Sequence, residues 1–291
     1  MAALPDESLL YVNRDDFLHV EYIRRTEKHV MPANHYHDYY EIYVLLSGER
    51  DYFIVDRTYR VKPGEIVFIG KNELHKTMQA GAPAHERLLL HFDDGLPFRM
   101  SPAATDWLLA PFRADSRVQR LPDDAAASAL TARVLKELRD KPPGYEIALR
   151  HAVCELLLAA GRHTLWLQQA KPEPEPFRHT SPMRGKISDI VRYINDSYAK
   201  PLSLAGLAER FYVSPYHLSR TFKETTGFTL TDYVNLTRIK EAQRLLRETT
   251  LSVTEVAAVA GYDNFSHFGK TFKKITRLTP RAYRSGTVNT L

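Results

Sequence analysis

The stretch "SPYHLSRTFKETTG", residues 214–227, returns in altered form as "NFSHFGKTFKKITR", residues 264–277. Each copy holds a Thr-Phe-Lys core that follows a basic residue. In the first copy Leu218 and Phe222 stand four residues apart, which places both on one side of a helix. The second copy repeats that spacing with two phenylalanines. We therefore expect two helices, each with a buried apolar face and an outward polar face.

A short helical pattern and a turn precede each copy. In "LSLAGLAERFYV", residues 202–213, the apolar residues recur at helical spacing. Ser214 before Pro215 is a helix start, because Ser caps the first turn and Pro needs no hydrogen bond there. In the second copy Ser252 and Glu255 form a capping-box pattern, and "GYDN" supplies the turn. Helix, turn and helix make a helix-turn-helix.

The two copies align with an offset of 49 residues before the turn and 50 residues after it. We therefore expect the second turn to be one residue longer. The connecting segment "TLTDYVNLTRIKEAQRLLRE", residues 229–248, has a Thr229/Asp232 cap and a continuous apolar face. At 1.5 Å per residue, a helix of about 19 residues is roughly 28 Å long. That length approaches the roughly 34 Å between major grooves on one face of DNA, so two successive grooves are within reach.

Charge is distributed unevenly along the 291 residues. The formal net charge is +5, yet residues 184–291 hold 17 Lys and Arg against 9 Asp and Glu, a net of +8. Residues 1–183 carry −3. A basic carboxyl-terminal module indicates a polyanionic partner. Between the halves "KPEPEPFRHTSPM", residues 171–183, has four prolines, which indicates an extended interdomain linker.

Two features of the sequence indicate the cellular compartment of the protein. No apolar run reaches the 18 or more residues of a membrane span, and the amino terminus lacks the order of a signal peptide. We expect a cytoplasmic protein with no membrane partner.

A family resemblance rests on a set of residues in the carboxyl-terminal module. The set comprises Arg220, Phe222, Lys223, Gly227, Tyr233, Arg238, Ile239, Ala242 and Leu245, then "GYDNFSHFGKTFKK" and "LTPRAYR". It resembles the AraC/XylS family of bacterial transcription regulators over about residues 186–285. One departure is Arg277, which stands where the second family motif usually has glycine.

The resemblance and the outward helix faces together predict the residues that contact double-stranded promoter DNA. They are Ser214, Tyr216, His217, Ser219, Arg220, Lys223, Asn264, Ser266, His267, Lys270 and Lys273. Arg and Lys can donate to guanine, Asn can pair with adenine, and Ser can reach phosphate. His217 and His267 have a second interpretation, in which each packs over its own helix. RNA polymerase is a further expected partner if the protein is an activator.

The amino-terminal half has a β-strand rhythm. From about residue 18 to residue 92, runs such as "YEIYVLL", "RDYFIVD" and "EIVFIG" alternate with turn residues, which predicts a small antiparallel barrel or sandwich. "HYHDYYEIYVLLSG" and "PGEIVFIGKNELH" are similar to the two metal motifs of cupins. In an extended strand His35, His37 and Glu41 share one parity, so all three can point into the barrel with His75.

Three uses of this cluster remain open: a metal site, a polar pocket for a sugar-type ligand, and plain packing. The predicted effector-binding residues are His35, His37, Tyr39, Glu41, Tyr43 and His75, and the candidate metal ligands are His35, His37, Glu41 and His75. Aromatic faces beside a carboxylate suit a hydroxylated, carbohydrate-like effector, although Tyr43 has core packing as a second interpretation. The regulator needs no cofactor; a divalent transition metal is the alternative for the pocket.

Residues 123–169 form two helical patterns broken by "KPPG" at 141–144. The second pattern is apolar on most of its circumference, which requires two burial partners. One partner is the barrel, and the other is the same helix of a second subunit, so a charge at Leu157 is expected to break a homodimer. The alternative is one thick intramolecular core.

The sequence therefore predicts an α+β protein. Residues 1–170 form a cupin-like antiparallel β-barrel with a helical dimerisation segment, and residues 184–291 form an all-α tandem helix-turn-helix domain. The favoured function is sequence-specific transcription regulation in response to a small molecule, with a sugar or sugar derivative as the expected effector. The alternative is a metal-dependent cupin enzyme with an accessory DNA-binding module. No catalytic residue is predicted, because no acid/base or nucleophile group accompanies the histidines.

Overall fold

The computed structural model describes residues 6–13, 17–27, 36–170 and 181–286. The chain divides into two compact units, Met1–Phe177 and Arg178–Leu291. The division falls within the segment expected to be a linker, most of which lies outside the described residues. The domain limits at 170 and 184 stay predictions.

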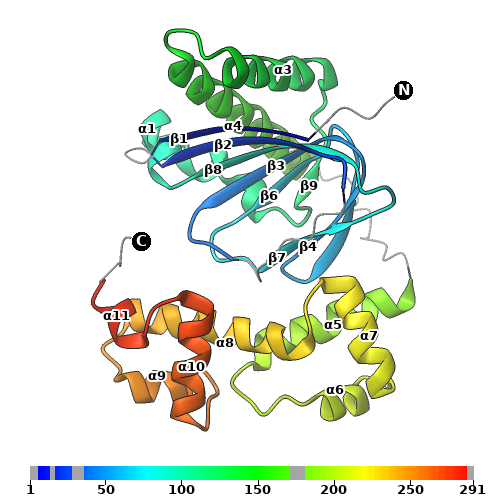
Figure 1. Ribbon diagram of the computed structural model, residues 1–291, viewed down its shortest axis with the longest axis vertical. Coiled ribbons are helices and arrows are strands. Elements are labelled where there is room, and N and C mark those ends of the chain that lie inside the picture. The colour runs from blue at the N-terminus through cyan, green and yellow to red at the C-terminus, as the bar shows by residue number, and fades with distance from the viewer. Residues whose placement is uncertain (1–5, 14–16, 28–35, 171–180, 287–291) are drawn as a thin grey trace. The chain divides into compact units, whose positions relative to one another are not determined.

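The first unit consists of two antiparallel sheets and the helices that cover one of them (Figure 1). The strands are β1 (Glu7–Asn13), β2 (Leu18–Arg25), β3 (Tyr40–Ser47), β4 (Arg50–Ile54), β5 (Arg57–Val61), β6 (Ile66–Ile69), β7 (His75–Gln79), β8 (His85–Phe92) and β9 (Val118–Gln119). One sheet has the order β1-β2-β8-β3-β6-β9, and the other has the order β5-β4-β7. The antiparallel β architecture is confirmed. β1 was not expected; it is an edge strand that pairs with β2.

β3 is buried on both faces because its alternate side chains enter two different cores. Ile42 and Val44 belong to the core beneath the helices, whereas Tyr43 and Leu45 belong to the core between the two sheets. Glu41 has the parity of Tyr43 and faces the smaller sheet. We call the space between the two sheets the lumen, lined by the odd-numbered residues of β3 and β8 and by β4 and β7.

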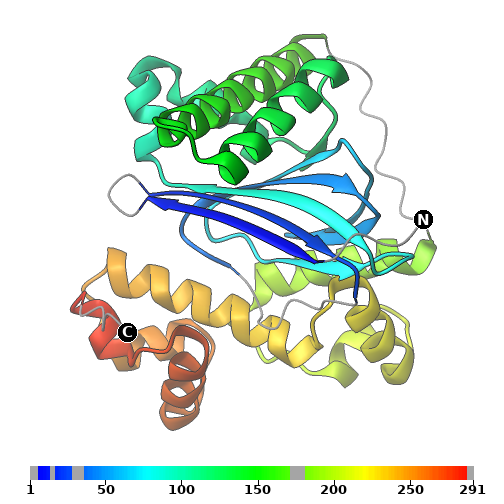
Figure 2. The ribbon, with the colours of Figure 1, turned by 45° about the horizontal axis from the view of Figure 1, so that its top comes forward.

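Helices follow the last long strand. They are α1 (Gly95–Met100), α2 (Thr105–Leu108), α3 (Asp124–Asp140) and α4 (Tyr145–Ala170), with short 3-10 turns η1 (Pro102–Ala104) and η2 (Ala110–Arg113). Figure 2 shows α3 and α4, in green, across the outer face of the six-stranded sheet. The break between α3 and α4 at 141–144 is confirmed. Among the described residues, no helix is both long enough and apolar enough to cross a bilayer.

The expectation for Leu157 is wrong. This side chain is fully buried in the core of its own unit, together with Leu90 and Leu149. A charge there would disrupt the fold rather than an interface, because the second burial partner of α4 is intramolecular. The exposed stripe of α4 consists of Ile147, His151, Glu155, Ala159, Arg162 and Trp166.

The second unit is built from seven described helices. They are α5 (Pro182–Ser197), α6 (Leu204–Arg210), α7 (Pro215–Thr226), α8 (Leu230–Glu248), α9 (Val253–Val259), α10 (Phe265–Thr276) and α11 (Pro280–Arg284). The predicted caps are confirmed: Ser214 accepts from the His217 amide, Thr229 accepts from the Asp232 amide, and Ser252 forms a capping box. Four residues separate α6 from α7 and five separate α9 from α10, so the extra residue in the second turn is also confirmed.

α8 is the 19-residue connecting helix, with one helix-turn-helix packed at each end (Figure 1). Its carboxyl-terminal half forms one core with α9 and α10, in which Phe268 and Phe272 are fully buried. Arg277 ends α10 in the left-handed region, with φ 65°. α10 therefore ends in the same left-handed conformation as α7, although the residue at this position is Arg277 in α10 and Gly227 in α7.

Candidate functional site

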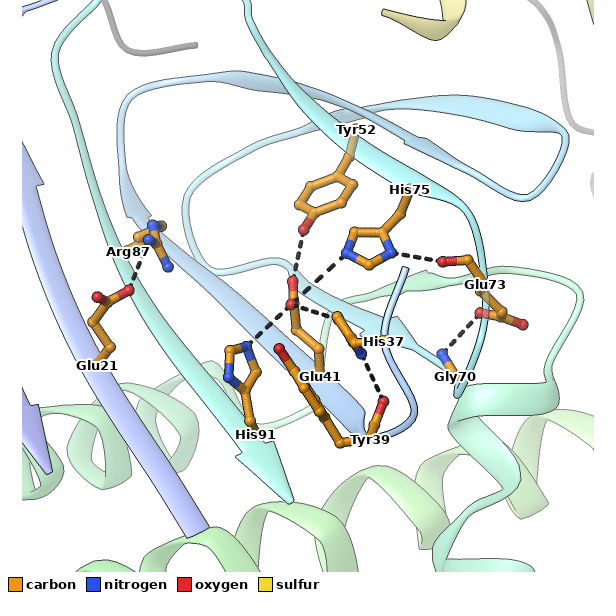
Figure 3. A network of polar contacts seen from close by, with 10 residues as sticks. All are labelled: Glu21, His37, Tyr39, Glu41, Tyr52, Gly70, Glu73, His75, Arg87 and His91. Carbon is orange, nitrogen blue, oxygen red and sulfur yellow. Dashed lines mark hydrogen bonds and ion pairs between the residues drawn. The ribbon is translucent and has the colours of Figure 1, made fainter. Parts of the chain in front are cut away.

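Glu41 is the centre of a polar cluster in the lumen (Figure 3). It is 1% exposed, and the β3–β8 register places it directly opposite His91. His91 Nε2 lies 3.1 Å from Glu41 Oε2, and His37 Nε2 lies 3.2 Å from the same oxygen. His75 Nε2 is 3.9 Å away, and the Tyr52 hydroxyl donates to Glu41 Oε1 at 2.7 Å. Three imidazoles and a phenol therefore converge on one carboxylate.

Backbone carbonyls fix the orientation of two of these rings. His37 Nδ1 donates to the Tyr39 carbonyl at 2.9 Å, and His75 Nδ1 donates to the Glu73 carbonyl at 2.8 Å. A carbonyl oxygen can only accept, so the proton sits on Nδ1 and Nε2 turns toward Glu41. A second proton on Nε2, or a metal ion, is then needed to join an imidazole to the carboxylate.

Electrostatics keep Glu41 ionised. Burial alone would raise the pKa of Glu41, but hydrogen bonds from His37 and His91 and the proximity of His75 hold that pKa well below its usual value. Burial and the neighbouring Glu41 charge raise the pKa of Tyr52 well above its usual value, so this phenol stays a donor. The cluster therefore holds one negative charge surrounded by groups able to carry positive charge.

A second polar group lies farther along the lumen. A cavity of about 70 Å³ is lined by Glu41, Tyr43, Arg50, Tyr52, Thr77, His85, Arg87 and Leu89. Arg50 and His85 are each 3% exposed. Arg87 Nη2 donates to Glu21 Oε2 at 2.8 Å, as Figure 3 shows. The two ends of the lumen thus differ in charge: imidazoles around a carboxylate at one end, and guanidinium groups at the other.

A larger cavity of about 480 Å³ lies on the opposite face of the six-stranded sheet, beneath α3 and α4. Its walls are mainly apolar and include Leu88, Leu130 and Leu156, with Glu86 and Arg120 among the polar lining residues. The sheet separates this cavity from the Glu41 cluster.

The recognition helices α7 and α10 expose the same kind of surface at equivalent positions. Arg220 and Lys223 on α7 correspond to Lys270 and Lys273 on α10, and all four side chains are exposed. Tyr216, near the start of α7, is 78% exposed. α7 buries Leu218 and Phe222 and α10 buries Phe268 and Phe272, so the basic face of each helix is available to a partner.

Arg238 connects the two helix-turn-helix halves from the middle of α8. Its Nε donates to the Tyr198 carbonyl at 2.8 Å and its Nη2 donates to the Lys200 carbonyl at 2.9 Å. The same guanidinium lies over the ring of Tyr262, in the second turn, at 5.5 Å. Gly261 approaches so closely that an added Cβ would lie 2.8 Å from Ala199 Cα. We call this set of contacts the α8 joint.

Comparison with known proteins agrees with both halves of this geometry. The family model described as "AraC-like ligand binding domain" matches residues 17–157, and the one described as "Helix-turn-helix domain" matches residues 207–286. The chain belongs to the AraC family of transcriptional regulators. It is a ligand-binding domain joined to a helix-turn-helix DNA-binding domain.

Three relatives illustrate the AraC-family match. "HTH-type transcriptional activator RhaR" of Cronobacter sakazakii is 26% identical over 87% of this chain and 86% of its own. "HTH-type transcriptional activator RhaS" of Pectobacterium carotovorum subsp. carotovorum is 23% identical over 89% of this chain and 90% of its own. "Bifunctional transcriptional activator/DNA repair enzyme AdaA" of Bacillus subtilis is 33% identical over 38% of this chain and 54% of its own.

The AraC-family lumen brings together most of the predicted effector and metal residues. His37, Glu41 and His75 offer ligand atoms that lie within 4.8 Å of one another. Tyr39 stacks on His37 with ring centroids 3.7 Å apart, and Tyr43 is buried and lines the 70 Å³ cavity of the lumen. His35 lies outside the described residues.

Sequence reasoning missed His91, Arg50, Arg87 and His85. His91 lies in no cupin motif, but strand parity in "RLLLHF" indicates it, because Arg87, Leu89 and His91 alternate toward the lumen.

The eleven predicted DNA-binding residues are all exposed, on α7, on α10 or at their first turns. Two of them also serve the fold: Ser214 and Asn264 are N-caps, whose side chains accept from the His217 and His267 amides at 3.3 and 2.9 Å. His267 lies beside Tyr262, in the turn before α10, with ring centroids 5.7 Å apart. Phe265, 52% exposed, was not predicted and adds an apolar group that suits a thymine methyl.

Proposed function

We propose that this AraC-family regulator reads two adjacent segments of promoter DNA, one with α7 and one with α10. The observation that carries the proposal is the pair of matched basic faces, with Arg220 and Lys223 on one helix and Lys270 and Lys273 on the other. Basic side chains at equivalent positions on two recognition helices can donate to guanine edges or phosphates in successive grooves.

The test is fluorescence anisotropy on operator and random DNA at several salt concentrations. Each phosphate contact adds about −0.9 to the slope of log affinity against log salt, so four contacts give about −3.6. Arg220→Ala and Lys270→Ala should each weaken operator binding by about 1–3 kcal/mol and weaken random DNA binding less. Equal losses on both DNAs would assign these two residues to phosphate, and a slope near zero would reject the proposed face.

The effector is proposed to bind in the lumen and to be a hydroxylated, carbohydrate-like molecule. Tyr39 and Tyr43 supply ring faces, and the Glu41 cluster supplies acceptors and donors for hydroxyl groups. A ligand shifts DNA binding only if it favours one arrangement of the protein over another. His37→Ala should therefore abolish the change in operator affinity on effector addition while leaving effector-free binding intact. A response that survives this substitution would place the effector elsewhere.

Promoter DNA, a homodimer and RNA polymerase complete the proposed set of partners. Promoter DNA as a partner places the protein at the nucleoid, in the bacterial cytoplasm. The dimer is proposed through the exposed stripe of α4, where Ile147 is 62% exposed and Trp166 is 61% exposed. RhaR and RhaS carry the words "transcriptional activator" in their names, which supports activation and hence contact with polymerase. For the same reason we infer a regulator rather than an enzyme.

The Glu41 cluster supports a second candidate role, the binding of a divalent transition metal. The donor set fits: His37 and His75 have their Nδ1 atoms occupied by carbonyls, and their Nε2 atoms converge on Glu41. His91 Nε2 joins them at the same carboxylate oxygen, and three nitrogens with one oxygen suit zinc, nickel or iron. A bound ion would supply a Lewis acid for effector hydroxyls.

Metal content measured on the full chain tests this role. After incubation with zinc and desalting, the wild type should retain close to one equivalent by mass spectrometry, and His75→Ala should retain little. Retention should fall as pH falls, because protons compete for the imidazoles. His151→Ala, on the exposed stripe of α4, is the matched control and should retain as much as the wild type. Equal retention by His75→Ala would refute the site.

A further inference from the structure

The far end of the lumen concentrates positive charge around a small cavity. Arg50 and Arg87 both line it, and His85 lies beside them. Glu41 is the single carboxylate among the described lining residues, and it already accepts hydrogen bonds from Tyr52, His37 and His91. Arginine stays protonated in proteins, so both guanidinium groups present positive charge and N–H donors to this cavity. The charge of this cavity therefore favours an anion.

An unsatisfied hydroxyl points to the same conclusion independently. The Tyr43 side chain is 2% exposed and lines the cavity, and its hydroxyl has no hydrogen-bond partner among the described residues. Buried polar groups in native proteins are almost always hydrogen-bonded, so a ligand atom at this position is favoured. Burial raises the pKa of Tyr43 to about 12, so the hydroxyl remains a donor at neutral pH.

The size of the cavity limits the ligand group. Its volume of about 70 Å³ is several times the roughly 10–15 Å³ that a single water molecule requires. A carboxylate group fits that volume, whereas a sugar ring belongs to pockets of roughly 300 Å³ or more. The cavity therefore suits the charged head of a molecule.

We infer that Arg50, Arg87 and Tyr43 form an anion site that binds the carboxylate of the effector. The inference rests on the proposed function and narrows its ligand class, from any carbohydrate-like molecule to an acid such as a sugar acid. The forked guanidinium groups match a carboxylate bidentately, and the Tyr43 hydroxyl adds a third donor. Glu21, which pairs with Arg87, balances part of this charge.

The test measures thermal unfolding of the full chain with sodium acetate, and with acetamide plus sodium chloride at matched ionic strength. Acetate should raise Tm by about 2 °C or more at saturation, and acetamide should not. Tyr43→Phe removes one donor without changing shape and should weaken acetate at least about threefold; Arg50→Met should weaken it at least about tenfold. Arg60→Met is the control, because Arg60 pairs with Asp51 outside the cavity.

Three outcomes would overturn the inference: no shift with acetate, an equal shift with acetamide, or unchanged acetate affinity in Tyr43→Phe. The phenylalanine variant keeps the test decisive if Arg50→Met fails to fold. A further measurement with D-glucose separates the two proposals. If D-glucose raises Tm and acetate does not, the anion site is rejected, and the proposal of a neutral sugar effector is retained. Operator binding, measured by anisotropy, reports on the proposed function independently of every ligand arm.

Discussion

Glu41 is the residue on which the sensor unit depends most directly. Its carboxylate is buried and ionised because histidines surround it, so its folded pKa lies below its unfolded value of about 4.5. Such a group stabilises the fold above the unfolded pKa, and this contribution is lost as pH falls toward the folded pKa. Between about pH 4.5 and the lower folded pKa, the unfolded chain binds up to one more proton at this site than the folded chain.

Glu41→Gln should therefore flatten the acid limb of the stability curve. One proton taken up on unfolding corresponds to about 1.4 kcal/mol per pH unit, and the variant should lack that slope between pH 4.5 and 3.5. Urea unfolding of the wild type and the variant at several pH values measures the difference. The quantity compared is the slope, so a lower stability of the variant at pH 7 does not interfere. Parallel acid limbs would contradict an ionised Glu41.

Arg277 has a left-handed backbone conformation at the end of α10, the position that Gly227 holds at the end of α7. A residue other than glycine in the left-handed region costs roughly 1–2 kcal/mol of folding free energy. Replacing it with glycine removes this strain, but the unfolded chain becomes more flexible, which offsets part of the gain in stability. Arg277→Gly should therefore stabilise the second unit by up to about 1 kcal/mol. Gly227→Ala, at the equivalent end of α7 with φ 77°, should destabilise it by a similar amount. Calorimetry of the full chain measures both, and a lower transition temperature for Arg277→Gly would show that its side chain contributes more than its backbone strain costs.

Only those lumen residues that belong to a recognisable sequence motif could be predicted from the sequence. His37, Glu41 and His75 follow from the spacing of the two cupin-like motifs, although His37 precedes β3, Glu41 lies on β3 and His75 begins β7 of the other sheet. His91 and Arg87 enter through the pairing of β3 with β8, 50 residues apart, and pairing register is not visible in either strand alone. The buried state of Leu157 was missed for a related reason: an apolar circumference does not show whether the second burial partner is the same chain or another.

At the scale of elements, the sequence predicted five of the seven described helices of the second unit, α6 to α10, and did not predict α5 or α11. Caps, the repeat offset and the apolar face of α8 are all local signals, and local signals fix helices well. The α8 joint was not predicted, because Arg238 contacts carbonyls 38 to 40 residues away and the turn that holds Tyr262.

Arg238→Ala should loosen one recognition helix relative to the other. The guanidinium makes two hydrogen bonds to backbone carbonyls, and a bond of this charged kind contributes about 1.5–3 kcal/mol. Affinity for an operator with both segments should fall roughly tenfold. Once one recognition helix has bound, a loosened joint holds the other recognition helix less firmly over its DNA segment, which lowers its effective concentration there. Affinity for DNA with one segment should change less than about threefold.

Arg244→Ala is the matched control for the joint. Arg244 lies on the same helix and pairs with Glu241 and Glu248 at the surface, whereas the carbonyls of Tyr198 and Lys200 accept their hydrogen bonds from Arg238. It should leave both affinities unchanged. Similar losses for the two variants would mean that α8 stability, and not the joint, governs binding.

For the whole molecule, the oligomeric state determines how many DNA segments are read at once. Trp166→Glu places a charge on the exposed stripe of α4 and should give a folded monomer in sedimentation experiments. Leu157→Glu should unfold the first unit, because an unpaired charge in a core is among the most destabilising changes known. A Trp166→Glu protein that sediments as a dimer would move the interface away from α4.

The α8 joint also has a consequence for how the regulator distinguishes its operator from the rest of a genome. In the proposed mode of binding, the two recognition helices are joined by one 19-residue helix and engage two DNA segments on the same side of the double helix, which repeats about every 10 base pairs. Five extra base pairs between the two DNA segments would turn the second segment to the opposite side of the double helix. Ten extra base pairs would return it to the same side, but at a separation longer than α8 can span. Sequences that match one segment alone, which are far commoner by chance, then act only as weak decoys. Spacing becomes information that the protein measures without touching the bases in between.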